Sequence, residues 1–111
     1  MELGVDLVEI GRVKALARRN PKFLTRVFSA AEIAYCRAKK KQWRHFAVRF
    51  AAKEAVWKAL GKDGVRLKDI SVGRDPRGKP GVLIKGKPAK AFVLSLSHSE
   101  RYALAVAVRT R

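Results

Sequence analysis

The 111-residue sequence predicts a single α+β domain in which helices come first and antiparallel strands follow. Up to Leu60, apolar residues recur at helical spacing, and Phe50 and Trp57 belong to one apolar stripe. After Gly61 the apolar pattern changes to alternation, which is typical of strands. We therefore expect N-terminal helices, with a long central helix packed on an antiparallel sheet, within one domain spanning residues 1–111.

The first predicted strand, residues 2–10, carries an acid on an otherwise apolar face. Asp6 points to the same side as Val8 and Ile10, because successive strand residues alternate between the two faces. A buried carboxylate is costly unless a cation, a metal ion or several hydrogen-bond donors lie beside it. Two interpretations of Asp6 follow from the residues: an ion pair with an arginine such as Arg12, or a metal site.

A short helix is predicted from Gly11 to Arg19, and its polar side is a basic ridge. A run of charges is usually only a solvated face, but acids do not interrupt this ridge, which favours a docking surface more than usual. Asn20 and Pro21 are expected to stop this helix and to start the next helical turn, with Asn20 as N-cap and Pro21 as first helical residue. The residues of the ridge are Arg12, Lys14, Arg18 and Arg19.

Ser29 and Glu32 form the pattern of a capping box and predict a helix that runs to about Arg37. After a basic loop, the central helix is predicted from about residue 42 to 60. Glu54 and Lys58 stand four residues apart on it, so both side chains emerge on one face. In isolation such a pair is ordinarily a solvated salt bridge worth a few tenths of a kcal/mol.

The second half of the chain predicts strands and turns. Strands are expected at residues 69–73 and 82–84, separated by turn residues 75–80, with one short helical turn at 87–90. Residues 92–98 and 102–109 are expected to pair as a hairpin, with His98 at the end of its strand.

Charge limits the choice of partner. Twenty-six Lys and Arg against nine Asp and Glu give a net charge of +17, so the surface attracts polyanions. Nucleic acid, anionic lipid, an acidic protein and a phosphorylated cofactor all satisfy this condition. The single cysteine, Cys36, rules out an intramolecular disulfide. The pattern of a signal peptide or a membrane span is missing from the sequence, so a cytoplasmic protein without a membrane partner is expected.

Three stretches, in this order, resemble one known family. They read GVDLVEIGR at residues 4–12, RFAAKEAVWKA at 49–59 and SHSERYALA at 97–105, and a GKP turn at 78–80 lies between the last two. They are similar to the 4′-phosphopantetheinyl transferases, and in particular to the small holo-acyl-carrier-protein synthase type. The resemblance covers essentially the whole chain. One departure is Asp75, where an Asn is common in relatives.

The resemblance implies a 4′-phosphopantetheinyl transferase fold and a Mg²⁺-dependent reaction. The phosphopantetheine arm of coenzyme A would pass to a serine of an acidic apo-acyl carrier protein, releasing adenosine 3′,5′-bisphosphate, in fatty acid or polyketide biosynthesis. Asp6 and Glu54 would hold the metal, which suits the preference of Mg²⁺ for carboxylates, water and phosphate oxygens. Glu54 and Lys58 would be the catalytic residues, with Lys58 reaching the leaving phosphate.

The resemblance also implies residues for both substrates. Arg49 and Lys53 are among the candidates for binding coenzyme A, although they could alternatively pair with a neighbouring subunit. A homotrimer with active sites shared between subunits is expected. Candidates for binding coenzyme A are Arg49, Lys53, Lys58, Gly78, Lys79, Pro80, His98 and Ser99, and candidates for docking the carrier are Arg12, Lys14, Arg18, Arg19 and Arg26.

The alternative function is a small basic nucleic-acid-binding protein. Net charge favours it, but aromatic residues are only 8% and the sequence shows no finger motif or basic-aromatic repeat. A nucleic-acid partner is therefore not expected.

Overall fold

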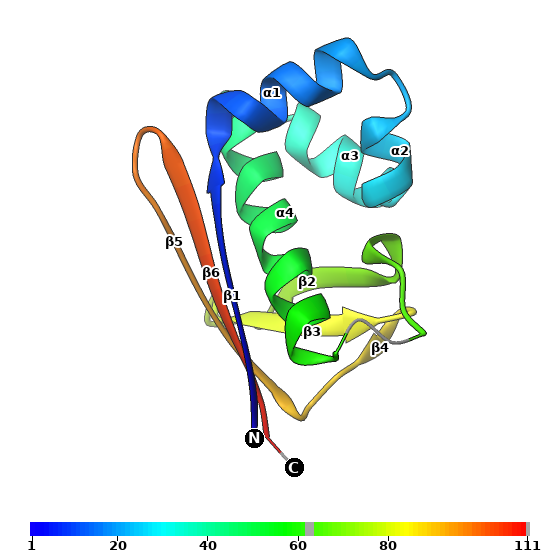
Figure 1. Ribbon diagram of the computed structural model, residues 1–111, viewed down its shortest axis with the longest axis vertical. Helices are drawn as coiled ribbons and strands as arrows, with labels where there is room; N and C mark the ends of the chain where they lie inside the picture. The colour runs from blue at the N-terminus through cyan, green and yellow to red at the C-terminus, as the bar shows by residue number, and fades with distance from the viewer. Residues whose placement is uncertain (62–63, 111) are drawn as a thin grey trace.

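In the computed structural model, which describes residues 1–61 and 64–110, a long helix lies between a three-stranded sheet and a group of shorter elements (Figure 1). The helix is α4 (Gln42–Ala59). The sheet on one side of it, called here the long sheet, has the antiparallel order β1-β6-β5. Its strands are β1 (Glu2–Glu9), β5 (Phe92–His98) and β6 (Tyr102–Arg109).

The remaining elements cover the other side and the two ends of α4 (Figure 1). A short sheet with the order β2-β3-β4 lies near the C-terminal end of α4. The shorter helices are α1 (Ile10–Arg19), α2 (Phe23–Val27) and α3 (Ala30–Arg37). The strands of the short sheet are β2 (Ile70–Arg74), β3 (Pro80–Ile84) and β4 (Lys87–Pro88). The 3₁₀ turn η1 (Leu67–Asp69) precedes β2.

Small residues let α4 lie close to the long sheet. Gly4 on β1 pairs with Ala107 on β6, and both face the helix from buried positions. Opposite them α4 presents Ala51, Ala55 and Ala59, which are at most 2% exposed. With no bulky side chain between them, the helix backbone approaches the strand backbone, so residues of β1 and α4 that are far apart in sequence become neighbours.

The structure confirms the α+β class and most predicted elements. Ser29 and Glu32 form the capping box in both directions, with bonds of 3.2 and 3.0 Å. The hairpin of β5 and β6 pairs Phe92 with Arg109 and His98 with Ala103. Gly61, just beyond α4, has a φ of +78°, as expected for a glycine that ends a helix.

Two local predictions are wrong. Asn20 does not cap α2: its backbone N–H donates to Leu16 O at the end of α1, and its side chain accepts from Lys22 N. The backbone of Asn20 thus ends α1, as the sequence predicts, while its side chain accepts a bond from the turn that follows, and α2 begins later than predicted, at Phe23.

Residues 87–90 do not form a helical turn. Lys85 and Gly86 have φ values of +51° and +80°, and this pair of left-handed residues reverses the chain tightly. Lys87 and Pro88 then pair with β3 as the strand β4.

Cys36 is fully buried, and burial raises the pKa of its thiol to about 11. The thiol therefore stays protonated and acts as a core side chain. Among the helices in residues 1–61 and 64–110, none combines the length and apolarity needed to cross a bilayer.

Candidate active site

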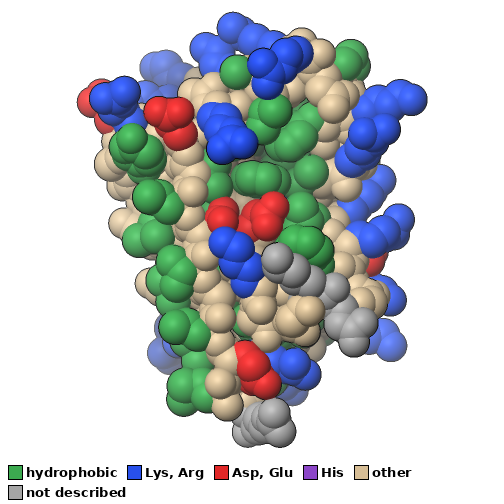
Figure 2. Space-filling view, in the orientation of Figure 1, with side chains coloured by type: hydrophobic (Ala, Val, Ile, Leu, Met, Phe, Trp, Pro, Cys, Tyr) green, Lys and Arg blue, Asp and Glu red, His purple; other side chains and the backbone are tan. Residues whose placement is uncertain are grey.

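The structure brings Asp6, Glu54 and Lys58 together on the wall of one cavity of about 490 Å³. β1 supplies Asp6, and α4 supplies Glu54 and Lys58, one turn apart. On the molecular surface, acidic side chains lie beside a basic one in the middle of a face, with hydrophobic side chains around them (Figure 2). These are the residues for which the sequence predicts a metal-phosphate site.

Lys58 is the cation beside Asp6. Its Nζ lies 3.1 Å from Asp6 Oδ1 and donates to Val5 O at 3.0 Å. Arg12 lines the same cavity, but the ion pair of Asp6 is made with Lys58, so the arginine interpretation of Asp6 is wrong. The Asp6 side chain is 14% exposed, whereas that of Lys58 is 42% exposed. Lys58 can therefore move toward a ligand more easily than Asp6 can.

The second oxygen of Asp6 fits a divalent cation. Oδ2 is buried and accepts no hydrogen bond within the described part of the chain, although an unpaired buried oxygen is costly. Glu54 is half-buried on the same wall. Two hard carboxylates suit Mg²⁺, which takes its other ligands from water and phosphate oxygens. Residues 1–61 and 64–110 contain no group of three or more His, Cys, Asp and Glu placed to hold a metal.

Apolar side chains form the rest of the cavity wall. Phe50 precedes Glu54 by one turn of α4, packs on Phe23 with ring centroids 5.7 Å apart, and also faces the cavity. Val13 and Leu16 of α1 and Tyr102 of β6 continue this wall. The sequence predicted Phe50 as a core anchor only, because its helical spacing shows burial but does not show a cavity beside it.

Arg49 lies on a different side of α4. It lines a second hollow of about 390 Å³ between α3, α4 and β2, with Arg74 on the opposite wall. Its guanidinium stands 4.3 Å from the centroid of the Tyr35 ring. Tyr35 was not predicted as a site residue, because a single tyrosine on a helix has no distinctive spacing.

His98 ends β5 and is exposed. The pKa of His45 is lowered, first by burial and then by nearby positive groups, among them Arg49 and His98. The His45 ring meets the Tyr35 ring edge-on at 6.2 Å. The predicted site residues therefore divide within one chain: Asp6, Glu54 and Lys58 line the first cavity and Arg49 lines the second hollow, whereas His98 is not among the residues that line either of them.

The GKP turn adjoins the second hollow. Arg74, which lines the second hollow, donates from Nη1 to Gly78 O at 2.7 Å. Asp75 Oδ1 accepts from the backbone N–H groups of Arg77 and Lys79, both at 2.9 Å. An asparagine oxygen could accept the same two bonds, so Asp75 preserves the turn despite its departure from the family pattern.

Lys53 is buried, contrary to the prediction that it holds coenzyme A. It has no exposed surface, and its Nζ donates to Glu32 Oε1, Leu67 O and Ile70 O. Burial is the main cause that lowers the pKa of Lys53, and the bond to Glu32 acts in the opposite direction. A partner subunit could not reach this ammonium either. The position of Lys53 in the core therefore fits neither the binding of coenzyme A nor pairing with a neighbouring subunit.

The remaining predicted residues are on the surface. Ser99 Oγ accepts from Tyr102 N at 3.1 Å and so helps to close the hairpin turn. Arg18 and Arg19 are exposed on α1, and Arg26 is exposed on α2. Lys14 is half-buried beside the basic residues 40, 41 and 44. Figure 2 shows Lys and Arg side chains along the edge where α1 lies, above the cavity.

Comparison with known proteins adds to this geometry. The model of the 4′-phosphopantetheinyl transferase superfamily matches residues 2–107. A holo-[acyl-carrier-protein] synthase of Koribacter versatilis is 41% identical over 114 residues, covering 92% of this chain and 91% of that protein.

Two solved structures are similar over almost the whole chain. One is a holo-(acyl-carrier-protein) synthase from Bacillus anthracis in complex with CoA (3′,5′-ADP), with a TM-score of 0.79, 32% identity and coverage of 99% of this chain and 96% of that one. The other is the Helicobacter pylori holo-[acyl-carrier-protein] synthase in complex with coenzyme A, with a TM-score of 0.76, 32% identity and coverage of 97% and 99%.

Proposed function

The chain belongs to the 4′-phosphopantetheinyl transferase superfamily, and we propose that it transfers the 4′-phosphopantetheine group of coenzyme A to a serine of an acidic apo-acyl carrier protein. The observation that carries this proposal is the meeting of Asp6, Glu54 and Lys58 in one cavity below the basic ridge of α1. Relatives named as holo-[acyl-carrier-protein] synthases support the carrier protein as acceptor, and relatives solved with coenzyme A support the donor. From the same resemblance we infer adenosine 3′,5′-bisphosphate as the other product, and a cytoplasmic role in fatty acid or polyketide biosynthesis.

In this proposal Asp6 and Glu54 would hold Mg²⁺, which would supply positive charge beside the pyrophosphate of coenzyme A. Lys58 adds a second positive charge. Its partly exposed ammonium can leave Asp6 and donate to an oxygen of the departing phosphate. Glu54, or a water molecule beside the metal, would accept the proton of the carrier serine. The apolar wall around Phe50 limits water near these charges, which strengthens their interactions.

The division of the predicted residues supports an active site shared between subunits. The outer face of the long sheet exposes a row of large apolar side chains, with Leu3, Val5, Leu7 and Val93 between 46% and 64% exposed. In Figure 2 a column of hydrophobic side chains follows this sheet. A face of this kind is typical of an interface between protein chains. We infer a homotrimer in which Arg49, His98 and the GKP turn of one subunit complete the cavity of its neighbour, and light scattering should give three times 12.4 kDa.

The basic ridge of α1 should steer the acidic carrier. Replacing Arg18 and Arg19 together by Glu is expected to raise the KM for the carrier about tenfold or more and to change kcat little, because exposed charges act mainly on encounter and register. The KM for coenzyme A should stay unchanged. Steady-state kinetics with a titrated carrier at low and high salt measures this effect, since screening should also raise the wild-type KM. As a control, Lys68→Glu makes the same kind of charge change on exposed η1, far from the ridge in sequence.

The direct test of the proposed function is a mass measurement. The protein is incubated with coenzyme A, Mg²⁺ and an apo-acyl carrier protein, and the carrier should gain the mass of phosphopantetheine. Omission of Mg²⁺, or addition of a chelator, should prevent the gain. If several carriers show no gain while the protein binds duplex DNA in a salt-sensitive way, the nucleic-acid alternative is correct and the proposal is wrong.

A further inference from the structure

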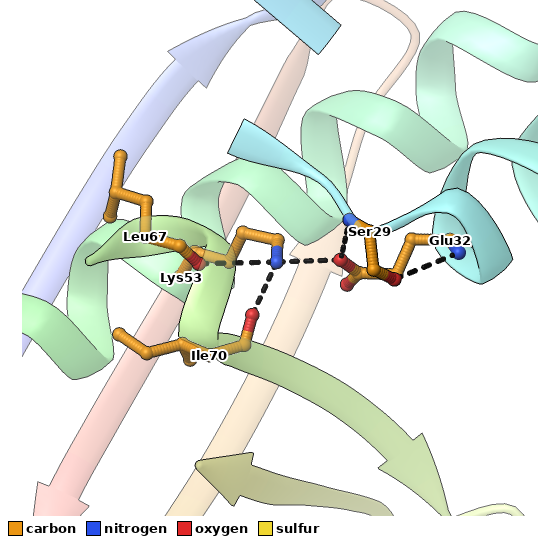
Figure 3. Close-up of polar contacts among 5 residues, drawn as sticks. All are labelled: Ser29, Glu32, Lys53, Leu67 and Ile70. Atoms are coloured by element: carbon orange, nitrogen blue, oxygen red, sulfur yellow. Dashed lines mark hydrogen bonds and ion pairs between the residues drawn. The ribbon is translucent and has the colours of Figure 1, made fainter. Parts of the chain in front are cut away.

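The interior of the protein contains an ion pair that the proposed mechanism does not use. Lys53, in the middle of α4, is fully buried, and its Nζ lies 2.7 Å from Glu32 Oε1. The same ammonium donates to the backbone oxygens of Leu67 and Ile70 (Figure 3). All three donor directions of this lysine are therefore occupied by groups inside the protein.

These bonds connect segments that are far apart in the sequence. Glu32 belongs to the first turn of α3, whereas Leu67 and Ile70 lie at the two ends of η1, where β2 begins. Glu32 is itself held in place, because its Oε1 accepts from Ser29 N and its N–H donates to Ser29 Oγ (Figure 3). The network thus holds one point of α4 between α3 and the start of the short sheet.

A network of this kind is poorly suited to a role in stability alone. A buried ion pair contributes little compared with well-packed apolar residues of the same volume, although loss of one partner is strongly destabilising. It does determine geometry, since its hydrogen bonds must keep their lengths and directions. The opposite side of α4 packs closely on the long sheet through Ala51, Ala55 and Ala59, and this contact sets the distance between helix and sheet without any polar bond from α4 to α3 or η1.

The position of α4 matters for the first cavity. Glu54 follows Lys53 directly and lies about 100° further around the helix, on the side of the cavity. Lys58 lies one turn beyond Glu54. Because both project from one rigid helix, a rotation or a slide of α4 would move them together relative to Asp6 on β1. Any such movement requires at least one of the Lys53 bonds to change.

We propose that Lys53 is a positioning residue: through its bonds to Glu32, Leu67 and Ile70 it fixes α4 so that Glu54 and Lys58 face Asp6 across the cavity. This inference rests on the proposed function, because it concerns the metal site and the catalytic lysine of that reaction. Lys53 does not touch either substrate.

The test is the double variant Lys53→Met with Glu32→Gln. Methionine keeps the length of the lysine stem without its charge, and glutamine keeps an oxygen that can accept from Ser29 N, so the capping box survives and no unpaired charge is buried. We expect the double variant to fold, with a Mg²⁺ concentration for half-maximal effect about tenfold higher and with a lower kcat. The KM for the carrier should not change, because the α1 surface is untouched. The single variant Lys53→Met should be less stable than the double variant, since it leaves Glu32 buried without its cation.

Mg²⁺ binding is measured without either substrate, as the rise in Tm of the protein during a Mg²⁺ titration. The matched control is Val56→Ala, which creates a cavity at a fully buried position of the same helix and alters no polar side chain. This variant should lose Tm and keep the wild-type Mg²⁺ dependence. If the double variant is too unstable to study, Glu32→Asp, which keeps an anion near Lys53 but shortens the side chain that reaches it, should give a smaller shift in the same direction.

The outcomes separate the two proposals. A double variant with wild-type Mg²⁺ dependence and wild-type kcat would overturn the positioning role while leaving the proposed function in place. An equal loss of Mg²⁺ affinity in Val56→Ala would also overturn it, since any loosening of α4 would then suffice. If the wild-type protein transfers no phosphopantetheine, the proposed function fails, and the positioning role fails with it.

Discussion

Replacement of Glu54 by Gln is expected to abolish phosphopantetheine transfer while leaving the fold intact. Glutamine has the shape of the glutamate but no charge, so the candidate metal site keeps only one carboxylate, that of Asp6. The same substitution removes the side chain that is a candidate to accept the serine proton. We expect kcat to fall by about a thousandfold or more, measured as carrier protein converted per unit time by mass spectrometry.

The control for Glu54→Gln is a variant that removes a carboxylate far from the candidate metal site. Glu100→Gln makes the same change on the exposed turn between β5 and β6, and it should retain wild-type turnover. The Tm of both variants without Mg²⁺ should lie close to that of the wild type, which separates loss of chemistry from loss of fold. Wild-type turnover in Glu54→Gln would exclude Glu54 both from the metal site and from catalysis.

Gly4→Ala is expected to be the most destabilising of the small substitutions that we predict. A Cβ at position 4 would stand 1.8 Å from Ala55 O and 3.0 Å from Ala59 N, which are backbone atoms of α4. Backbone cannot move aside as the end of a long side chain can, so β1 and α4 must separate. We expect a loss of roughly 3–5 kcal/mol in the free energy of unfolding, measured by urea denaturation, or a protein that does not accumulate in folded form.

Gly11→Ala provides the matched control, because a Cβ at Gly11 meets nothing within 4 Å. Gly11 lies in α1, where alanine has the higher helix propensity, so this variant should gain up to about 1 kcal/mol. A Gly4→Ala variant as stable as the wild type would contradict the close approach of β1 and α4. Because Asp6 is two residues from Gly4 on the same face of β1, separation of the two elements would also move Asp6 away from Glu54.

Local patterns were sufficient to predict much of this fold. The capping box needs only Ser29 and Glu32, three residues apart, and the structure contains both of its bonds. The hairpin of β5 and β6 depends on two alternating runs and the short connection between them. The end of α4 at Gly61 depends on one glycine. In each case the interacting groups are close in sequence, so residue type and spacing almost determine the geometry.

Local reasoning was wrong where one residue has two possible local partners. The sequence predicts that Asn20 ends one helix and starts the next; the structure uses Asn20 to end α1, whereas α2 starts only at Phe23. Residues 87–90 have no strong pattern, and their pairing with β3 depends on the tight turn at Lys85 and Gly86. In both cases the local structure depends on where the neighbouring helix or strand lies, and short-range residue preferences do not determine that position.

For the candidate site, the sequence by itself identified the unusual acid Asp6 and the pair Glu54 and Lys58, and the order of the motifs indicated the family. Only the tertiary structure decided which cation Asp6 meets, because Lys58 is 52 residues away. Likewise it decided that Lys53 is buried and holds Glu32, 21 residues earlier, although its neighbour Glu54 faces a cavity. The physical reason is that a helix repeats every 3.6 residues and so shows which residues share a side, whereas the packing of the whole chain determines what that side faces.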